Sequence, residues 1–210
     1  MRRVLEFGGF IAGGILIAFG IAVIVLALAG HRTVTTELKQ QRIVGTPDMT
    51  PSAITEEVSK AGLKDVKIPS CDVAGKPIDT GNRARCFAQY MNIHALLSTG
   101  GFVYSEMGIY QAKPGTPVKE LSPGGGTNNA DYALPDANGK PTQNAARNVW
   151  VTETGLSTAL NMSYMATALS LFSLVVGIAL ILAGVGFVIL ALSALPRHAA
   201  PATSAAAASE

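Results

Sequence analysis

The chain has 210 residues, with 16 Lys and Arg against 14 Asp and Glu, so its formal net charge is +2. Only 14% of its residues are charged and 49% are hydrophobic, whereas an ordinary soluble domain is about 25% charged. This composition argues against a wholly soluble protein, and the near balance of charge excludes a nucleic-acid-binding protein with a concentrated basic face.

The first predicted element is an apolar helix over residues 7–30, which follows a short N-terminal segment, 1–6. None of these 24 helical positions is charged. At about 1.5 Å per residue such a helix reaches about 36 Å, enough to cross a hydrocarbon core of about 30 Å. A secretory signal cleaved between Ala29 and Gly30 is the open alternative, because Ala27-Leu28-Ala29 offers a small-residue cleavage site. The length of the apolar run favours an uncleaved anchor, since signal peptides carry about 7–15 apolar residues.

Residues 31–163 are expected to form a small, mainly α domain between two membrane spans. In chain order, the pattern predicts a helical continuation over 34–44, a helix from Thr50-Pro51 to Gly62, a short strand over 66–68 and a helix over 83–98. Thr is a favoured N-cap, Pro suits the first helical position and Gly ends helices, which sets the bounds of the second of these elements.

The two cysteines, Cys71 and Cys86, both lie in this domain. An even number of cysteines in an exported domain indicates a disulfide, and closing a loop of about 15 residues stabilises by about 3 kcal/mol in the chain-entropy model. Two reduced thiols in a cytosolic domain are the alternative. A metal site on Cys71, Cys86 and His94 would lack a fourth ligand, and the spacing matches no standard zinc module, so no metal site is predicted.

The domain also contains an arm, residues 111–142, with five Pro and five Gly in 32 positions. That density opposes helices and strands, so the arm is expected to be irregular and to look disordered, with Pro123-Gly124-Gly125-Gly126 as its most flexible point. A helix is predicted over 144–164, with Gly155 as its weak point, running into the second span.

The second span is predicted over residues 164–195, and a low-complexity, disordered tail over 196–210. Arg2 and Arg3 precede the first span, and Arg197 follows the second. Because Lys and Arg in short flanks resist translocation, both termini are expected in the cytoplasm and the central domain outside the plasma membrane.

Small residues recur every seven positions in both spans. The predicted helix-packing positions are Gly13, Gly20 and Ala27 in the first span, and Gly177, Gly184 and Ala191 in the second. Small residues let membrane helices approach closely, and a seven-residue period keeps them facing one partner. The pattern favours an antiparallel hairpin of the two spans, with contacts between copies of the chain as the alternative use of the same glycines.

The sequence supplies no catalytic set. It lacks G-x-S-x-G, H-E-x-x-H, S-x-x-K and Walker motifs, and neither an enzyme nor a cofactor is predicted. Tyr90, His94 and Tyr104 are the candidate ligand or partner contacts, with packing as the alternative role of His94. Asp72 and Asp79 are interpreted as solvated turn residues.

Three segments carry a family resemblance: CDVAGKPIDTG (71–81), ARCFAQYM (84–91) and ARNVWVTET (146–154). They resemble a family of small actinobacterial membrane proteins with two helices bracketing a domain. The resemblance implies the same layout over most of residues 1–195. Some relatives carry an aromatic ring-opening dioxygenase label, but a non-haem iron site needs two His and a carboxylate that converge on one metal. Only His31 and His94 are expected on the outer side, and His31 is expected at the edge of the bilayer, so this activity is not predicted.

We therefore expect an integral membrane protein of the cell envelope whose outer domain is a protein-interaction or accessory module. Its partners would be the lipid bilayer and a membrane or envelope protein, and not nucleic acid. The alternative is a ligand sensor or an accessory subunit of a membrane transporter.

Overall fold

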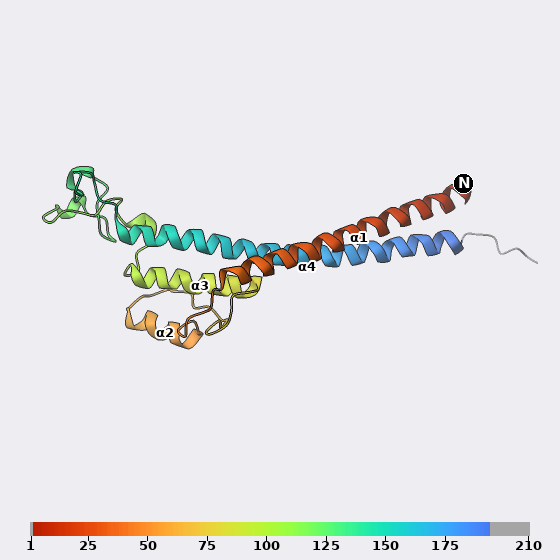
Figure 1. Cartoon of the computed structure of the whole chain (residues 1–210), viewed down its shortest axis with the longest axis horizontal. Helices are drawn as coiled ribbons and strands as arrows, with labels where there is room; N and C mark the ends of the chain where they lie inside the picture. Colours follow the sequence, from red (N-terminus) through yellow and green to blue (C-terminus); the bar gives the residue numbers. More distant parts are fainter. Residues whose placement is uncertain (1, 194–210) are drawn as a thin grey trace, which may run out of the picture. The chain divides into compact units, whose positions relative to one another are not determined.

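The computed structural model describes residues 2–193, with side chains from Phe7 onward, so the tail predicted over 196–210 lies outside the described residues. The helices are α1 (Arg2–Gln41), α2 (Pro51–Lys60), α3 (Gly81–Ser98) and α4 (Ala145–Ser193), with three 3₁₀ helices, η1 (Tyr104–Glu106), η2 (Val118–Glu120) and η3 (Ala130–Tyr132) (Figure 1). The chain forms two compact units. We call residues 30–169 the domain, and residues 2–29 with 170–193 the helical unit.

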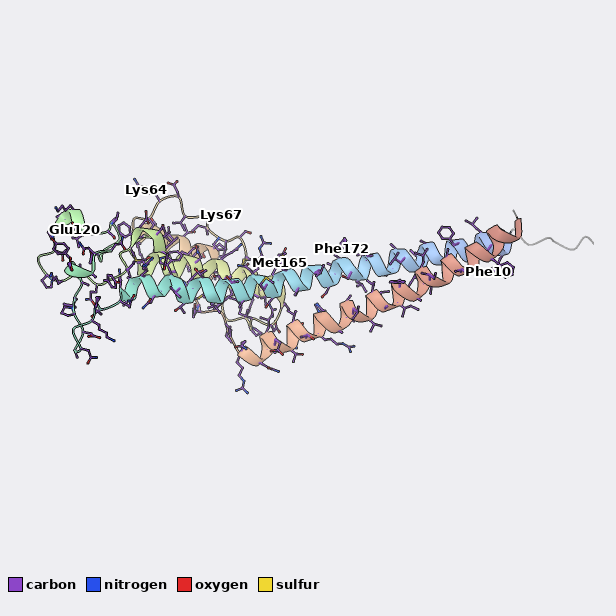
Figure 2. The ribbon with its side chains drawn as sticks, turned by 90° about the horizontal axis from the view of Figure 1, so that it is seen from above. Phe10, Lys64, Lys67, Glu120, Met165 and Phe172 are labelled. Carbon is purple, nitrogen blue, oxygen red and sulfur yellow. A yellow bond between two sulfur atoms is a disulfide. The ribbon has the colours of Figure 1, made fainter. Side chains whose placement is uncertain are left out.

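The two long helices, α1 and α4, confirm the predicted apolar segments. Both are long and apolar enough to cross a membrane, and only 17% of the most apolar stretch of each is buried. In the helical unit Phe172 is 65% exposed, and its side chain, like that of Phe10, projects from the ribbon (Figure 2). A core helix of a soluble protein buries such side chains, because their transfer from water drives folding.

Within the helical unit, α1 and α4 approach each other closely at glycines. A Cβ atom added to Gly13 would lie 2.7 Å from the carbonyl oxygen of Gly184, and one added to Gly20 would lie 2.7 Å from that of Gly177. Ala191 contacts Gly9, since a Cβ there would lie 3.0 Å from the Cβ of Ala191. Ala27 is also buried, with 6% of its surface exposed. At each of these glycines the side chain of any other residue would meet the opposite helix.

The bounds of α2 follow from its capping residues. The hydroxyl of Thr50 accepts a hydrogen bond from the Ala53 backbone N–H at 3.2 Å, as an N-cap does. At the other end Leu63 N–H donates to Val58 O and Gly62 N–H donates to Ser59 O. This pair of bonds is a Schellman motif, which needs the positive φ of 67° that Gly62 adopts.

Helix α3 begins at Gly81, two residues before its predicted start, because Thr80 supplies the N-cap and accepts from Arg83 N–H. Gly81 lies against α4, where a Cβ would come within 2.5 Å of the Thr167 hydroxyl oxygen. The absence of a side chain at the first turn therefore lets α4 pack on α3.

The domain core joins all four helices. Its buried side chains include Tyr90 of α3 and Ile54 of α2, together with Leu38 near the end of α1 and Leu160 of α4. Helices α2 and α3 lie side by side (Figure 1). The C-terminal part of α1 is thus a structural element of the domain.

One local prediction was wrong. Residues 66–68 form no strand, since no backbone in the described part of the chain pairs with them, and a strand needs a partner. Gly155 does not interrupt α4, which continues from Ala145 to Ser193. An isolated Gly costs a helix about 1 kcal/mol, too little to break so long a helix.

The arm, residues 111–142, contains η2 and η3 but is tied together by backbone hydrogen bonds. Tyr110 and Thr127 exchange both of theirs at 2.9 Å, and Thr127 is fully buried. The Pro-Gly-Gly-Gly segment is part of this packing, since a Cβ on Gly124 would lie 2.7 Å from atoms of Met107 and Phe102. The expectation of a disordered-looking arm, with this segment as its most flexible point, is therefore corrected: the glycines allow close packing.

Asn144 attaches the arm to the start of α4. Its backbone N–H donates to Ile109 O and its side-chain amide donates to Gly108 O, both at 3.0 Å. The indole N–H of Trp150, one turn and a half into α4, donates to Phe102 O at 2.9 Å. These bonds fix the segment that leads from α3 into the arm.

Candidate functional site

The predicted disulfide is confirmed. Cys71 and Cys86 are joined by an S–S bond of 2.07 Å with a Cα–Cα distance of 6.1 Å. The bond fastens the loop before α3 to the second turn of that helix. Because both sulfurs are in the disulfide, neither is a thiolate that could bind a metal with His94, and the alternative metal site on these cysteines is excluded.

Tyr90 belongs to the core and is not a surface contact. Its side chain is 0% exposed, and its hydroxyl donates a hydrogen bond to the Cys71 carbonyl oxygen at 2.7 Å. The prediction that Tyr90 contacts a ligand or partner is corrected for this reason: nothing outside the domain can touch its ring.

Tyr104 lies on η1 and is 44% exposed. The guanidinium of Arg147, from α4, sits 4.0 Å from the centre of its ring, in a cation–π contact. Tyr104 therefore helps to hold η1 against α4. The three side chains predicted as a contact set, Tyr90, His94 and Tyr104, are not brought together, since neither Tyr90 nor Tyr104 lines either groove described below.

Tyr90 gives a pH-dependent prediction. Burial raises the pKa of the Tyr90 hydroxyl above its ordinary value of 10.0, and the charge of Asp72 raises it further. A raised folded-state pKa contributes stability that is present below about pH 10 and lost as pH rises through the folded value. We expect Tyr90→Phe to be less stable at pH 8 by about 1 kcal/mol, the worth of one hydrogen bond, but to decline less steeply above pH 10. Unfolding midpoints of the unaltered chain and of Tyr90→Phe, measured at pH 8 and above pH 10, test this. An equally steep decline of the two midpoints with pH would contradict it.

The domain has a groove of about 700 Å³, with a mixed polar and apolar lining, between α3, α4 and the segment 66–70. Its lining includes Gln89 and Asn92 from α3 and Asn161 from α4. Glu153 of α4 lies at its wall and is only 6% exposed. The Ser157 hydroxyl donates a hydrogen bond to the Glu153 carboxylate, which leaves other acceptor positions of that carboxylate for a ligand.

A second groove, of about 560 Å³, is mainly apolar and runs between α3 and α4. Met91, Val149 and Leu156 supply its apolar lining, and His94 lies at its edge. His94 is thus the one predicted contact residue of the three that reaches a groove.

His94 also meets two carboxylates. Its Nε2 atom lies 2.7 Å from Oδ2 of Asp48, and Asp48, Glu57 and His94 each place one potential ligand atom within 4.8 Å of the other two. All three residues are partly buried. Burial raises the pKa of Asp48, but hydrogen bonds from Thr46 and from its own backbone N–H, together with the facing His94, outweigh burial and lower the pKa from 3.8.

Sequence reasoning missed this cluster. Asp48 precedes α2, Glu57 lies on α2 and His94 lies on α3, so the residues are separated by nine and 37 positions and match no ligand motif. Only the packing of α2 on α3 brings Glu57 to His94. The available signal was that Asp48 sits two positions before the Thr50 N-cap, which places it at the N-terminal end of a predicted helix.

The acidic residues considered from the sequence form ordinary ion pairs. Asp79 is 2.7 Å from Arg83, and Asp72 is 3.5 Å from Lys76 while also accepting from Ala74 N–H. Both pairs are one helical turn apart in sequence and exposed enough to be worth about 1 kcal/mol or less. They hold the turn that carries the disulfide.

No protein-family model, curated protein or solved structure matches the chain. The resemblance of residues 71–91 and 146–154 to a family of two-helix membrane proteins stays a prediction from the sequence.

Proposed function

We propose that the protein spans the plasma membrane twice, with both termini in the cytoplasm and the domain outside. The observation that carries this proposal is that two apolar helices, largely exposed along their length, flank a domain closed by a disulfide. Lipid is the medium in which exposed Leu, Ile and Phe are stable. A disulfide persists in oxidising compartments and is rare in the cytosol.

The two spans form an antiparallel hairpin in this proposal, and the first is an uncleaved anchor. Contacts in the helical unit support the pairing, since Gly13 contacts Gly184 and Gly20 contacts Gly177. Residue numbers therefore increase along α1 where they decrease along α4, as in an antiparallel pair. Cleavage after Ala29 would remove Gly13 and Gly20 and leave the α4 glycines without a partner.

The outer domain acts as an interaction or accessory module for a membrane or envelope protein and does not act as an enzyme. The arm presents apolar side chains to solvent: Val118 of η2 is 85% exposed and Leu121 is 40% exposed. Backbone hydrogen bonds hold the arm in one conformation, so binding there orders little chain and loses little entropy. The arm is the proposed recognition surface.

The alternative function is a ligand sensor or an accessory subunit of a transporter. The groove of about 700 Å³ favours it, because its volume suits a small molecule and it carries amide side chains beside the buried Glu153. In this alternative a small polar molecule occupies the groove, and native mass spectrometry of the detergent-purified protein would detect it.

One experiment tests membrane sidedness and the recognition surface together. Cysteine is introduced singly as Val118→Cys in the arm, as Lys64→Cys between α2 and α3, or as Ala205→Cys in the tail. Lys64 is the matched control for Val118: it is also exposed and lies away from Glu120 of the arm (Figure 2). Intact cells are treated with a membrane-impermeant maleimide that carries a photo-crosslinker.

We expect both domain positions to react in intact cells and position 205 to react only after permeabilisation. After irradiation, Val118→Cys should give one discrete adduct and Lys64→Cys should give none. Labelling of Val118→Cys only in broken cells would overturn the outer location. If both domain positions were labelled but neither formed an adduct, the proposal of an interaction module would be overturned in favour of the ligand sensor.

A further inference from the structure

We propose that Asp48, Glu57 and His94 bind a divalent transition-metal ion, with Zn²⁺ as the representative. The site lies within the domain, where α2 packs on α3. Imidazole nitrogen combined with carboxylate oxygens is a donor set that suits Zn²⁺ and similar ions. The proposal does not depend on the side of the membrane that the domain faces.

The distances suit one shared ion. The three donor atoms all lie within 4.8 Å of one another, and His94 Nε2 is 2.7 Å from Asp48 Oδ2. Ligands at about 2.1 Å from a tetrahedral ion are about 3.4 Å from one another. Side-chain rotations that move the donor atoms by about an ångström would bring the three separations to this value.

The backbone already holds the three residues in place. Glu57 is followed by Val58, and His94 stands between Ile93 and Ala95, all of which are buried. The neighbour of Asp48, Met49, is 1% exposed, and its carbonyl accepts a hydrogen bond from Val73 N–H at 3.2 Å. An ion would therefore find its ligands positioned by a packed core, which lowers the entropy lost on binding.

The His94 ring pairs with Asp48, but its Nε2 atom takes part in no well-aligned hydrogen bond. Its Nε2 atom is buried and makes no hydrogen bond, although Asp48 Oδ2 is 2.7 Å away. The contact lacks the alignment that an N–H donor requires. Nε2 thus lies within reach of both carboxylates, as a metal ligand would.

The local charge favours a cation. Two carboxylates converge on one imidazole, and none of the Lys and Arg side chains in the described part of the chain forms a salt bridge with Asp48 or Glu57. The nearby Lys60 pairs instead with Glu56, at 2.6 Å. With three protein ligands, a tetrahedral ion keeps one position for water or for a donor from another molecule.

The test uses the full chain in detergent, without a polyhistidine tag and after removal of metal by a chelator. Zn²⁺ binding is measured by calorimetry, and Co²⁺ substitution is followed by its visible absorption, whose intensity distinguishes a tetrahedral protein site from octahedral aqueous Co²⁺. The decisive variant is Glu57→Gln, and its matched control is Glu56→Gln, the adjacent carboxylate on the same helix. His94→Ala and Asp48→Asn complete the set, with His31→Ala as the control for histidine.

We expect one Zn²⁺ per chain, with affinity reduced at least about tenfold by Glu57→Gln, Asp48→Asn or His94→Ala. Glu56→Gln and His31→Ala should bind as the unaltered chain does. Mg²⁺ should not compete, because it prefers an all-oxygen octahedral shell. Absence of Zn²⁺ binding to the unaltered chain, or equal affinity of Glu57→Gln and Glu56→Gln, would overturn the site. Circular dichroism confirms that each variant is folded.

Discussion

Replacing Gly20 and Gly184 together by Ile is expected to separate α1 from α4 in the helical unit. A Cβ on Gly20 would lie 2.6 Å from a side-chain atom of Ile181 and 2.7 Å from the Gly177 carbonyl oxygen, and a Cβ on Gly184 would lie 2.7 Å from the Gly13 carbonyl oxygen. Backbone atoms cannot move aside as a flexible side chain does. Overpacking costs typically about 1–3 kcal/mol at each site, so we expect a loss of about 2–6 kcal/mol, measured by titrating the detergent-purified protein with dodecyl sulfate.

The same helices provide matched controls. No atom lies within 4 Å of a Cβ on Gly14 or Gly186, so Gly14→Ile with Gly186→Ile introduces the same residues without a clash. Because Ile has a higher helix propensity than Gly, this control should be as stable as the unaltered chain. Equal loss of stability in both pairs would contradict the contact between the helices. A change of oligomeric state in the first pair alone, at unchanged stability, would assign these glycines to contacts between copies of the chain.

Replacing Gly126 by Ala is expected to destabilise the packing of the arm against the start of α4. Gly126 has a φ of 75°, and a Cβ there would lie 2.6 Å from both the Tyr110 carbonyl oxygen and the Asn144 side-chain nitrogen. The left-handed backbone costs an L residue about 1–2 kcal/mol, and the clash adds about 1–3 kcal/mol. We expect a total loss of about 2–5 kcal/mol in the stability of the arm, read as faster hydrogen exchange at the Thr127 and Tyr110 amides.

Gly125 separates these two costs. Its φ is 84°, but nothing lies within 4 Å of a Cβ at that position, so Gly125→Ala carries the backbone strain without the clash. We expect a loss of about 1–2 kcal/mol there. If the Thr127 and Tyr110 amides exchanged no faster in Gly126→Ala than in Gly125→Ala, the stability of the arm would not depend on close packing at Gly126.

Local chemistry accounts for the elements that the sequence predicted well. Thr50 caps α2 and Gly62 ends it, because capping hydrogen bonds and positive φ involve only neighbouring residues. The strand expected over 66–68 does not form, because strand formation depends on residues far away in the sequence. A strand needs a partner elsewhere in the chain, and three apolar or alternating residues do not specify one.

The candidate site was only partly visible from the sequence. Cys71 and Cys86 were identified because a chain with two cysteines in one exported domain allows a single pairing within it. Tyr90 was misplaced, since its position on α3 does not reveal that its ring is buried against the loop of Cys71. Asp48 and Glu57 were not noticed, because their meeting with His94 depends on how α2 packs against α3.

The sequence by itself determined the two long apolar helices, the disulfide and the caps of α2. Each depends on hydrophobic composition, on covalent chemistry or on hydrogen bonds between near neighbours. Only the tertiary structure decided that the Gly-rich arm is packed, that Tyr90 lies in the core and that His94 faces two carboxylates. These outcomes depend on contacts between residues far apart in the chain, and such contacts are set by the shapes that the packed helices present to one another.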